Sequence, residues 1–455
     1  MKSFIAFLLL FVSCHVYAQD APINNDERPI LIRGVNILPM DHEEIIPNQD
    51  ILVHNGMIIK IRKTGRIHPG KNAVVIEAKG KYIIPGLAEM HAHVPPTEDE
   101  NEIQRQLNLF LLHGITTIRG MLGHPKHLVV RAKVLNKELP GPRFYTSGPS
   151  FNGNSVKSAE EGKEMVRKQK QDGYDFLKIH PGLTRENFDA VAEQAMISDI
   201  ELAGHVPFDV GIWRATETRY ATIDHLDGFL EGITPGIQNI AANDAGLFGI
   251  FLTDKIDTTQ FNRLAKALRQ NHIWLVPTQA LAERWMSPLV KPEDLMKAEG
   301  MQYIPAATAN QWANAKRNFM STPKYDSAQA VRYLELRRRL IKFLHENSVG
   351  ILLGSDAPQV FNVPGISTHQ ELEYLVQAGI SPYFALASGT VNVGFFFNNN
   401  TGIIREGKRA DFLVLDKNPL ENISNTRSIW GIMSGHYWLG NDYRIKMLKS
   451  LEVHP

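Results

Sequence analysis

The sequence has almost no cysteine and no excess of charge of one sign. One of its 455 residues is a cysteine, and 49 lysines and arginines face 48 aspartates and glutamates, for a formal net charge of +1. A chain without a field of one sign does not attract polyanions by charge. We therefore expect no nucleic-acid partner and no electrostatic attachment to a membrane.

The apolar run near the N-terminus is too short to span a bilayer. A positive start, the run 5–12 and the small-residue site at 16–18 together predict a signal peptide over residues 1–18, and hence a periplasmic or secreted protein. The alternative is lipidation at Cys14, which would place the protein on a membrane. If the leader is removed, no cysteine remains, so any metal site must use histidine, lysine and carboxylate ligands.

Short β-like runs occur near both ends of the chain. Several lie within residues 29–85, where His54-Asn55-Gly56 is a turn signal between two of them, and others lie within 399–455. Neither set is large enough to close a core alone. We therefore expect both ends to pair into one small β-sandwich domain.

Strand and helix signals alternate between residues 86 and 398, which favours a parallel sheet. Eight such units match a (β/α)₈ TIM barrel, an α/β fold. An open doubly wound sheet is the alternative, but no glycine-rich phosphate fingerprint follows the first strand. The strand candidates are Gly86–Val94, Gly114–Met121, Arg143–Gly148, Phe176–His180, Glu201–Val206, Ala221–Leu226, Ile273–Ala280 and Gly350–Ala357.

Helical stretches separate most of these strands, and one connection is unusually long. Ser158–Asp172, Thr184–Ser198 and Thr258–Gln270 are typical of helices, the last with Asp257 as a cap. Residues 281–350 form a connection of about 70 residues, far longer than usual. We expect this insertion to rise over the catalytic face as a lid.

The strongest chemical signal is the segment Pro85-Gly86-Leu87-Ala88-Glu89-Met90-His91-Ala92-His93. On a strand, residues two apart point to the same face, so His91 and His93 project together. At a barrel mouth they would form a two-imidazole clamp for a divalent metal. Two histidines on one face are often without function, but their place at the end of an apolar strand favours the metal site.

Further short motifs follow along the chain in the order in which they occur in the amidohydrolase superfamily. With them the sequence resembles this superfamily, and within it the imidazolonepropionase-like and prolidase-like hydrolases. The resemblance covers about residues 30–440. The motifs are Phe176-Leu177-Lys178-Ile179, Ala203-Gly204-His205-Val206, Ile223-Asp224-His225, Leu353-Gly354-Ser355-Asp356-Ala357 and the run 402–416.

The resemblance implies a metal-dependent hydrolase with two divalent ions, which we expect to be zinc, although manganese, iron and cobalt stay open. Lys178 would be N-carboxylated and bridge the metals, and Asp356 would be both a ligand and the catalytic base. The implied ligands are His91, His93, Lys178, His205, His225 and Asp356.

The residues themselves leave alternatives open. Lys178 lies in an apolar strand, where a buried charge is costly, but it could also snorkel or pair with a carboxylate. His205 and His225 each end a short apolar strand, and either alone could be a core histidine. Asp356 could cap the helix that follows.

Other side chains near the strand ends could touch substrate or orient ligands. Arg119, at the end of the second strand, is the best candidate to bind a substrate carboxylate, and Arg143, which opens the third strand, is interpreted as structural. His124 and His180 follow strands at the same mouth. Asp224 and Glu89 could orient imidazoles or be merely structural. Five histidines on helical or peripheral stretches are set aside: His113, His127, His272, His345 and His436.

The predicted reaction is cleavage of an amide, in a dipeptide or N-acyl amino acid, by metal-activated water. The sequence departs from the family pattern twice. Arg119-Gly120 stands where many relatives carry Arg-Asp. Leu226-Asp227-Gly228-Phe229 lacks the tyrosine that helps hold substrate in relatives, which weakens the dipeptidase assignment but not that of the metal centre. Hydrolysis of a cyclic amide, a lactone or another ester is the alternative, followed by a non-catalytic periplasmic binding protein. A homo-oligomer is also compatible with the sequence.

Overall fold

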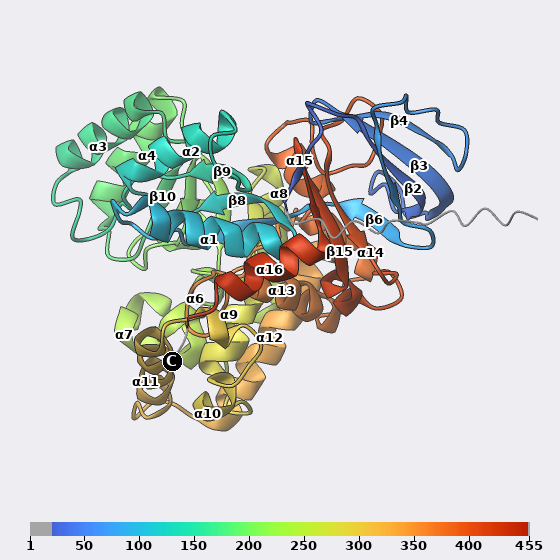
Figure 1. Cartoon of the computed structure of the whole chain (residues 1–455). Coiled ribbons are helices and arrows are strands. Elements are labelled where there is room, and N and C mark those ends of the chain that lie inside the picture. The colour runs from blue at the N-terminus through green and yellow to red at the C-terminus, as the bar shows by residue number, and fades with distance from the viewer. Residues whose placement is uncertain (1–20, 454–455) are drawn as a thin grey trace, which may run out of the picture.

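A computed structural model describes residues 21–453, so the predicted signal peptide and Cys14 lie outside the described residues. Parallel strands occupy the middle of the chain, as predicted (Figure 1). Isolated parallel bridges, such as Ser147 to Phe176, connect the two sheets. Three strands form one sheet and four the other: β7 (Leu87–Ala92), β8 (Ile115–Gly120) and β9 (Arg143–Thr146), then β10 (Leu177–Ile179), β11 (Leu202–Gly204), β12 (Tyr220–Asp224) and β13 (Trp274–Val276).

The eighth predicted strand, Gly350–Ala357, is not a regular strand. Only Ile351 and Ala357 form bridges, to Leu275 and Ala92. Between them the Ser355 amide donates to the Glu89 carboxylate at 2.6 Å instead of to a neighbouring carbonyl, which interrupts the ladder. Since the segment joins β13 and β7 through single bridges, a closed barrel stays a prediction.

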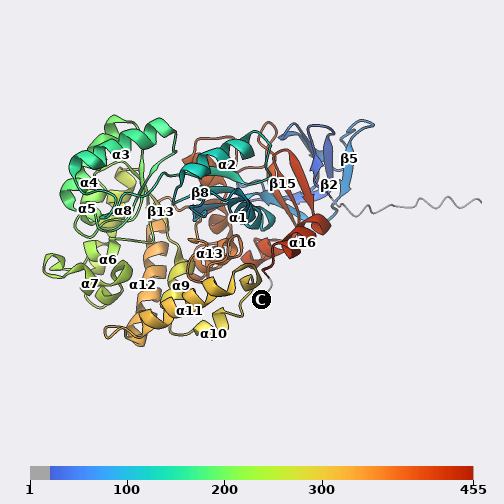
Figure 2. The same ribbon diagram turned by 60° about the vertical axis from the view of Figure 1, so that its left-hand side comes forward.

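Both chain ends contribute to a separate nine-stranded sheet, which we call the chain-end sheet. It is one continuous sheet, not two hydrogen-bonded sheets, and it buries its own apolar cluster (Figures 1 and 2). The predicted turn is present, with Asn55 and Gly56 both at positive φ, as a two-residue hairpin loop requires. Its strands are β1 (Ile23–Asn24), β2 (Ile30–Ile37), β3 (Ile46–His54), β4 (Met57–Lys63), β5 (Val74–Glu77), β6 (Tyr82–Pro85), β14 (Asp411–Leu415), β15 (Ile429–Ser434) and β16 (Tyr437–Gly440).

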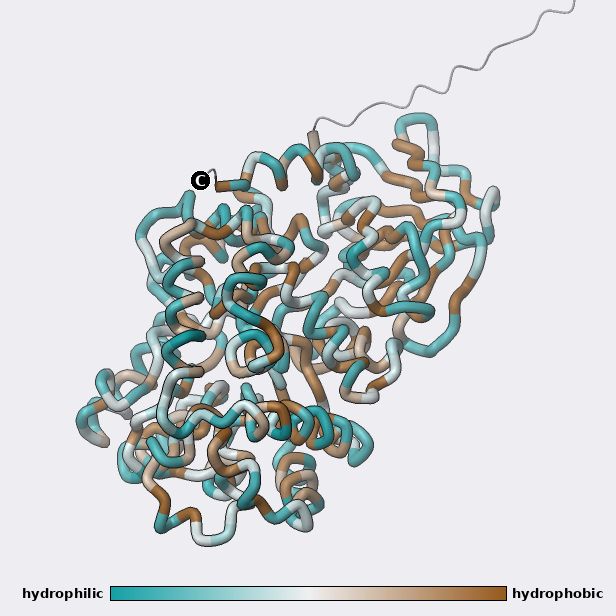
Figure 3. Tube along the Cα trace, turned by 90° about the horizontal axis from the view of Figure 1, so that it is seen from below, coloured by the Kyte–Doolittle hydropathy of each residue, from teal (hydrophilic) through white to brown (hydrophobic). Residues whose placement is uncertain are grey.

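The three predicted helices form, and Asp257 accepts a backbone N–H of the first turn, as predicted. Ser158 and Thr184 cap the other two helices in the same way. Hydrophobic and hydrophilic segments alternate along the outer helices (Figure 3), as in helices buried on one side. None of the described helices is both long and apolar enough to cross a membrane. The helices around the central strands are α1 (Glu100–Leu112), α2 (Pro125–Leu135), α3 (Ala159–Asp172), α4 (Arg185–Ile197), α5 (Gly211–Ala215), α8 (Phe261–Gln270), α13 (Ile366–Gln377), α14 (Pro382–Ser388) and α15 (Val391–Phe396), and α16 (Asn441–Ser450) follows β16.

Two long connections, not one, carry extra helices. The predicted insertion holds most of α9 (Gln279–Met286), α10 (Pro292–Leu295), α11 (Ala306–Met320) and α12 (Ser327–Glu346). The connection between β12 and β13 adds α6 (Phe229–Gly232), α7 (Ala242–Ala245) and the 3₁₀ segment η2 (Leu247–Leu252). In Figure 1 the helices α7, α10, α11 and α12 form a lobe beside the central strands. Movement of this lobe as a lid stays a prediction.

Candidate metal centre

His91 and His93 converge on Asp356, as their spacing on β7 predicts. His93 Nε2 lies 2.6 Å from Asp356 Oδ1, and His91 Nε2 lies 3.5 Å from the same oxygen. Asp356 comes from the segment 350–357, which passes directly beside β7. Gly354 makes this approach possible, because a Cβ there would lie 2.9 Å from the His91 backbone nitrogen.

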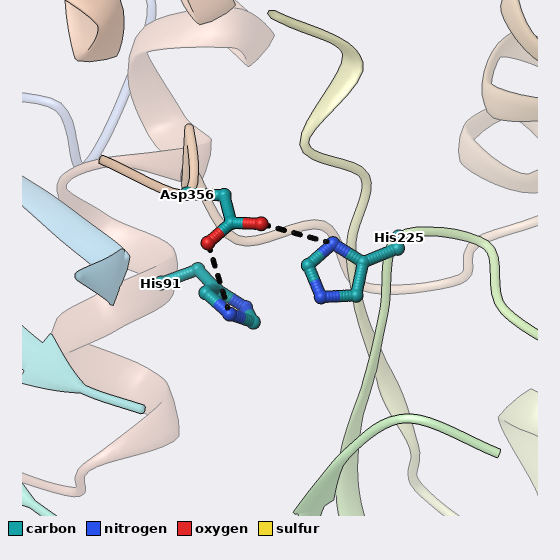
Figure 4. Close-up of side chains that lie close together, drawn as sticks. All are labelled: His91, His225 and Asp356. Carbon is teal, nitrogen blue, oxygen red and sulfur yellow. Dashed lines mark ion pairs between the residues drawn. The ribbon is translucent and has the colours of Figure 1, made fainter. Parts of the chain in front are cut away.

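The other predicted ligands complete one connected cluster. The His225 ring lies 4.5 Å from the His91 ring and 4.5 Å from the His205 ring, between centroids. Lys178 Nζ lies 3.3 Å from His91 Nε2. Ligand atoms of His91, His225 and Asp356 lie within 4.8 Å of one another (Figure 4), close enough to share a metal ion. We call the six side chains, His91, His93, Lys178, His205, His225 and Asp356, the metal centre.

Two residues of the metal centre have unusual backbone conformations. His225 has φ 64° and Asp356 has φ 65°, in the left-handed region that side chains with a Cβ rarely adopt. Leu226 and Thr278, beside the centre, share this feature. Such outliers persist only when the surroundings enforce them, and they cluster at functional sites.

Three imidazoles have a polar partner at Nδ1: His205 and His225 through a hydrogen bond, and His91 through a close contact with a carboxylate. Asp224 Oδ2 lies 2.8 Å from His91 Nδ1, which gives Asp224 the orienting position predicted for it. Asp227 Oδ2 lies 2.9 Å from His205 Nδ1, and the Thr278 hydroxyl lies 2.8 Å from His225 Nδ1. For His91 and His205 a partner at Nδ1 leaves Nε2 free to bind a metal. His225 instead turns Nδ1 toward Asp356, with Oδ2 at 3.7 Å.

Of the two roles open to Glu89, the structure shows the structural one. Its carboxylate accepts hydrogen bonds from the Ser355 amide and hydroxyl and from Thr368 Oγ1, at 2.6 to 2.7 Å, and from the His91 amide at 3.2 Å. Glu89 therefore orients no imidazole. It holds the backbone on both sides of the metal centre, beside His91 and beside Asp356.

Burial lowers the pKa of three imidazoles of the centre, those of His91, His205 and His225. Desolvation, followed by the nearby Lys178 charge, holds the pKa of His91 well below its ordinary value, and desolvation lowers that of His205 to about 3. Burial also lowers the pKa of Lys178 to about 8. Neutral imidazoles, a lysine that readily loses its proton and a carboxylate are a donor set that suits a divalent ion.

Of the three predicted substrate contacts, Arg119 is already bonded within the protein. Arg119 is buried, donates to the Met90 carbonyl at 2.8 Å and to Thr222 Oγ1 at 3.0 Å, and lies 3.5 Å from Asp224. This guanidinium is occupied by the protein, so its geometry favours positioning of Asp224 over contact with a substrate carboxylate.

Of the other two predicted substrate contacts, His180 lies beside the metal centre and His124 does not. The His180 ring lies 5.0 Å from the His205 ring, next to the metal centre. His124 instead caps α2, accepting the Lys126 amide at 3.3 Å, and its Nε2 lies 3.7 Å from Glu98. His180 keeps its place beside the centre, whereas the contacts of His124 are those of a helix cap.

Several residues at the centre were not predicted. Phe248, with φ 53°, stacks its ring at 5.0 Å on His225 and at 6.1 Å on His205. Arg337 of α12 is buried and donates to the His225 carbonyl at 2.7 Å and to the Pro277 carbonyl at 2.8 Å. Phe248 lies in a long irregular connection, and Arg337 lies within a helix whose pattern does not distinguish it. The Asp227 position was visible only as Leu226-Asp227-Gly228-Phe229, the departure from the family pattern.

Comparison with curated proteins gives local similarity only. A dihydroorotase from Caldanaerobacter subterraneus subsp. tengcongensis is 35% identical over 96 residues, which is 21% of this chain and 21% of the relative. An adenine deaminase from Paracoccus denitrificans is 32% identical over 65 residues, 14% of this chain and 11% of the relative. The chain thus matches about a fifth or less of the length of these relatives.

Solved structures share the fold over nearly the whole chain. A Xaa-Pro dipeptidase with bound methionine has a TM-score of 0.65 at 19% identity, covering 90% of this chain and 100% of that one. The bottromycin amidohydrolase has a TM-score of 0.70 at 20% identity, covering 92% and 89%. Molinate hydrolase has a TM-score of 0.66 at 16% identity, covering 95% and 98%.

A sequence model of the amidohydrolase family matches residues 82–434, from β6 through β15 and thus across every residue of the metal centre. This range is more than half of the chain. The chain therefore belongs to the amidohydrolase family, a family of metal-dependent hydrolases.

Proposed function

We propose that the protein hydrolyses the amide bond of a dipeptide or an N-acyl amino acid, on a (β/α)₈ barrel with two divalent metal ions, zinc in the simplest case. The observation that carries the proposal is the convergence of the six side chains of the metal centre from strands and segments far apart in the chain. When bound, such ions lower the pKa of water toward neutrality and polarise a carbonyl.

Lys178 would hold both ions as an N-carboxylated lysine. Formation of a carbamate needs a neutral amine, and burial lowers the pKa of this amine to about 8. No carboxylate lies within ion-pair distance of Lys178 among the described residues, so the lysine is not held as half of an ion pair. A lysine in this setting is suited to react with CO₂.

Asp356 would accept the proton of the attacking water and deliver it to the leaving nitrogen. His93 lies 2.6 Å from its Oδ1, and the Glu89 hydrogen bonds to Ser355 fix the backbone beside it. Asp224 and Asp227 would hold His91 and His205 in the orientation that directs Nε2 to the centre.

The substrate would lie between His180 and Phe248, the two rings that pack against His205. The stacked Phe248 ring gives this side of the centre an apolar wall, which suits an aliphatic or ring-shaped substrate group. With Arg119 occupied, His180 is the remaining predicted partner for a substrate carboxylate. The fold is shared with a Xaa-Pro dipeptidase, which is compatible with this class of substrate.

Hydrolysis of a cyclic amide is the second candidate. The specific observation in its favour is the local similarity to dihydroorotases, at 35% identity over 96 residues. A cyclic amide need not carry a carboxylate, and a ring without one would not need the cation that Arg119 does not supply.

Metal analysis and a substrate screen test the proposal. Purified protein should hold about two divalent ions per chain, and Lys178→Ala should lose metal and activity. A panel of dipeptides, N-acyl amino acids, cyclic amides and lactones should then show turnover of the linear amides. Turnover of cyclic amides alone would replace the first candidate by the second, and full activity of Lys178→Ala would contradict the carbamate.

Export to the periplasm is proposed from the leader alone. The mature protein should begin at Gln19, which mass spectrometry of the intact protein measures directly. A mature chain that begins with a lipidated Cys14 would contradict this and place the enzyme on a membrane.

A further inference from the structure

A large cavity lies away from the metal centre. Its volume is about 770 Å³, in the range of small-molecule sites in proteins. It lies between α2, the first residues of β9 and the β16–α16 end of the chain-end sheet. Since β9 begins at this cavity, the site is at the opposite end of the parallel strands from His91 and Asp356.

The wall of the cavity is mainly apolar. Leu135, at the end of α2, leaves 80% of its surface exposed there, which is unusual for a leucine. Exposed apolar side chains around a concavity are typical of binding sites. The apolar and aromatic residues of the wall include Leu111, Leu128, Val134, Leu139, Tyr437 and Tyr443.

One cation in this wall has no partner. Arg143, the first residue of β9, is half-buried, and among residues 21–453 its side chain makes no hydrogen bond and no ion pair. Three other cations of the wall are neutralised. Arg131 pairs with Asp175 at 2.6 Å, Lys137 with Asp26 at 2.6 Å and Arg409 with Asp411 at 2.7 Å.

Arg143 is half-buried as a residue, but none of its side-chain nitrogens is fully buried, so the guanidinium stays open to an anion in the cavity. The planar fork of arginine matches a carboxylate with two parallel hydrogen bonds. The sequence suggested a structural role for Arg143, but a structural arginine would be bonded to the protein, as Arg119 and Arg337 are.

We propose that this cavity binds an amphiphilic carboxylate, with the carboxylate on Arg143 and a long apolar tail along Leu135 and the rest of the α2 wall. Arg143 and Glu138 are the charged side chains of the wall without an ion pair among the described residues. Arg143 supplies the partner for one carboxylate, and the apolar wall selects a tail over a compact polar anion. The proposal does not depend on the reaction at the metal centre, because the two sites share no residue.

Calorimetric titration of the full protein with dodecanoate, below the concentration at which it forms micelles, tests the site. We expect saturable binding to one site. Arg143→Met should weaken it about tenfold or more, since it removes a charge-assisted pair of hydrogen bonds. Dodecanol should bind more weakly than dodecanoate, with an affinity that Arg143→Met does not change. Leu135→Ser should weaken the binding of both.

Two control variants separate this site from its alternatives. Arg66→Met removes an exposed arginine outside the cavity that also has no side-chain partner among the described residues, and it should bind dodecanoate as the native protein does. Asp356→Asn should also bind it normally. Equal affinity of native protein and Arg143→Met, absence of saturable binding, or a loss confined to Asp356→Asn would each overturn the proposal, the last by placing dodecanoate at the metal centre.

Discussion

The metal centre and the interior of the chain-end sheet are both buried, but they contain opposite kinds of side chain. The sheet interior consists of aliphatic residues with Phe412 and Trp438. The metal centre consists of imidazoles, a lysine and a carboxylate, and His91, Lys178 and His225 are exposed by 1% or less. The backbone of the metal centre is also irregular, with left-handed conformations at His225 and Asp356.

The difference separates the source of stability from the source of activity. Burying apolar surface stabilises a fold by about 25 cal/mol per Å², whereas burying polar groups costs free energy unless each is paired. Substitutions that shorten buried side chains of the chain-end sheet should therefore lower the stability of the fold. The folded fraction of such variants should keep an intact metal centre. Variants of the metal centre should lose activity while the folded state is little changed, or even more stable.

The largest effect on stability should come from the sheet. Trp438→Ala removes a side chain that is 1% exposed, so the free energy of unfolding should fall by about 3–5 kcal/mol. Denaturant unfolding measures this, and metal content at low temperature should stay unchanged. A loss of metal at a temperature where the variant is fully folded would show that the chain-end sheet also determines metal binding.

The largest effect on activity should come from Asp356. Asp356→Asn keeps the size of the side chain but removes the base, so kcat should fall by about 10² or more. KM should change much less, and the melting temperature should stay close to that of the native protein. Steady-state kinetics on the best substrate of the panel measure both constants. An unchanged kcat would make Asp356 a metal ligand only.

The regular parts of the fold could be predicted from the sequence, and the irregular parts could not. Seven strands follow from apolar runs, and the start of one helical stretch follows from its cap, Asp257. The segment 350–357 has the composition of a strand, but a side chain remote in sequence, Glu89, takes the hydrogen bonds of Ser355. Long-range competition of this kind leaves no trace in periodicity.

The same division holds within the site. The ligand types could be predicted because each ends an apolar strand, where a polar side chain needs a reason to be buried. The strand that carries Arg119 could be predicted, but the direction of its side chain could not. Only the structure shows that its guanidinium donates to the Met90 carbonyl and to Thr222 Oγ1. Arg337 could not be found at all, because its helix interior looks like any other amphipathic helix.

An intermediate effect should come from Arg337, which connects α12 to the metal centre. Arg337→Met removes the hydrogen bonds to the His225 and Pro277 carbonyls, so His225 should be held less firmly. Metal affinity should fall by about tenfold or more, measured by competition with a chelator. Arg332→Met, an exposed arginine of the same helix, should bind metal normally. If Arg337→Met lowers stability but not metal affinity, the residue supports packing only.

The smallest effect concerns buried histidines outside both regions. His369 of α13 hydrogen-bonds the Thr426 hydroxyl and the His113 carbonyl, at 2.9 and 2.8 Å. Burial lowers its pKa from 6.5 to about 3. Because the folded pKa is the lower one, the unfolded chain takes up the proton first, and stability is lost as the pH falls below about 6.5.

His369→Gln should remove this part of the pH dependence. Between pH 7.5 and 6 the free energy of unfolding of the native protein should fall by about 0.8 kcal/mol more than that of the variant. The histidines of the metal centre titrate in both proteins, so their contribution cancels in the difference. His68→Gln, at an exposed position, should follow the native protein. Parallel pH profiles for native protein and His369→Gln would mean that His369 takes up its proton without unfolding, and that its burial does not limit stability in acid.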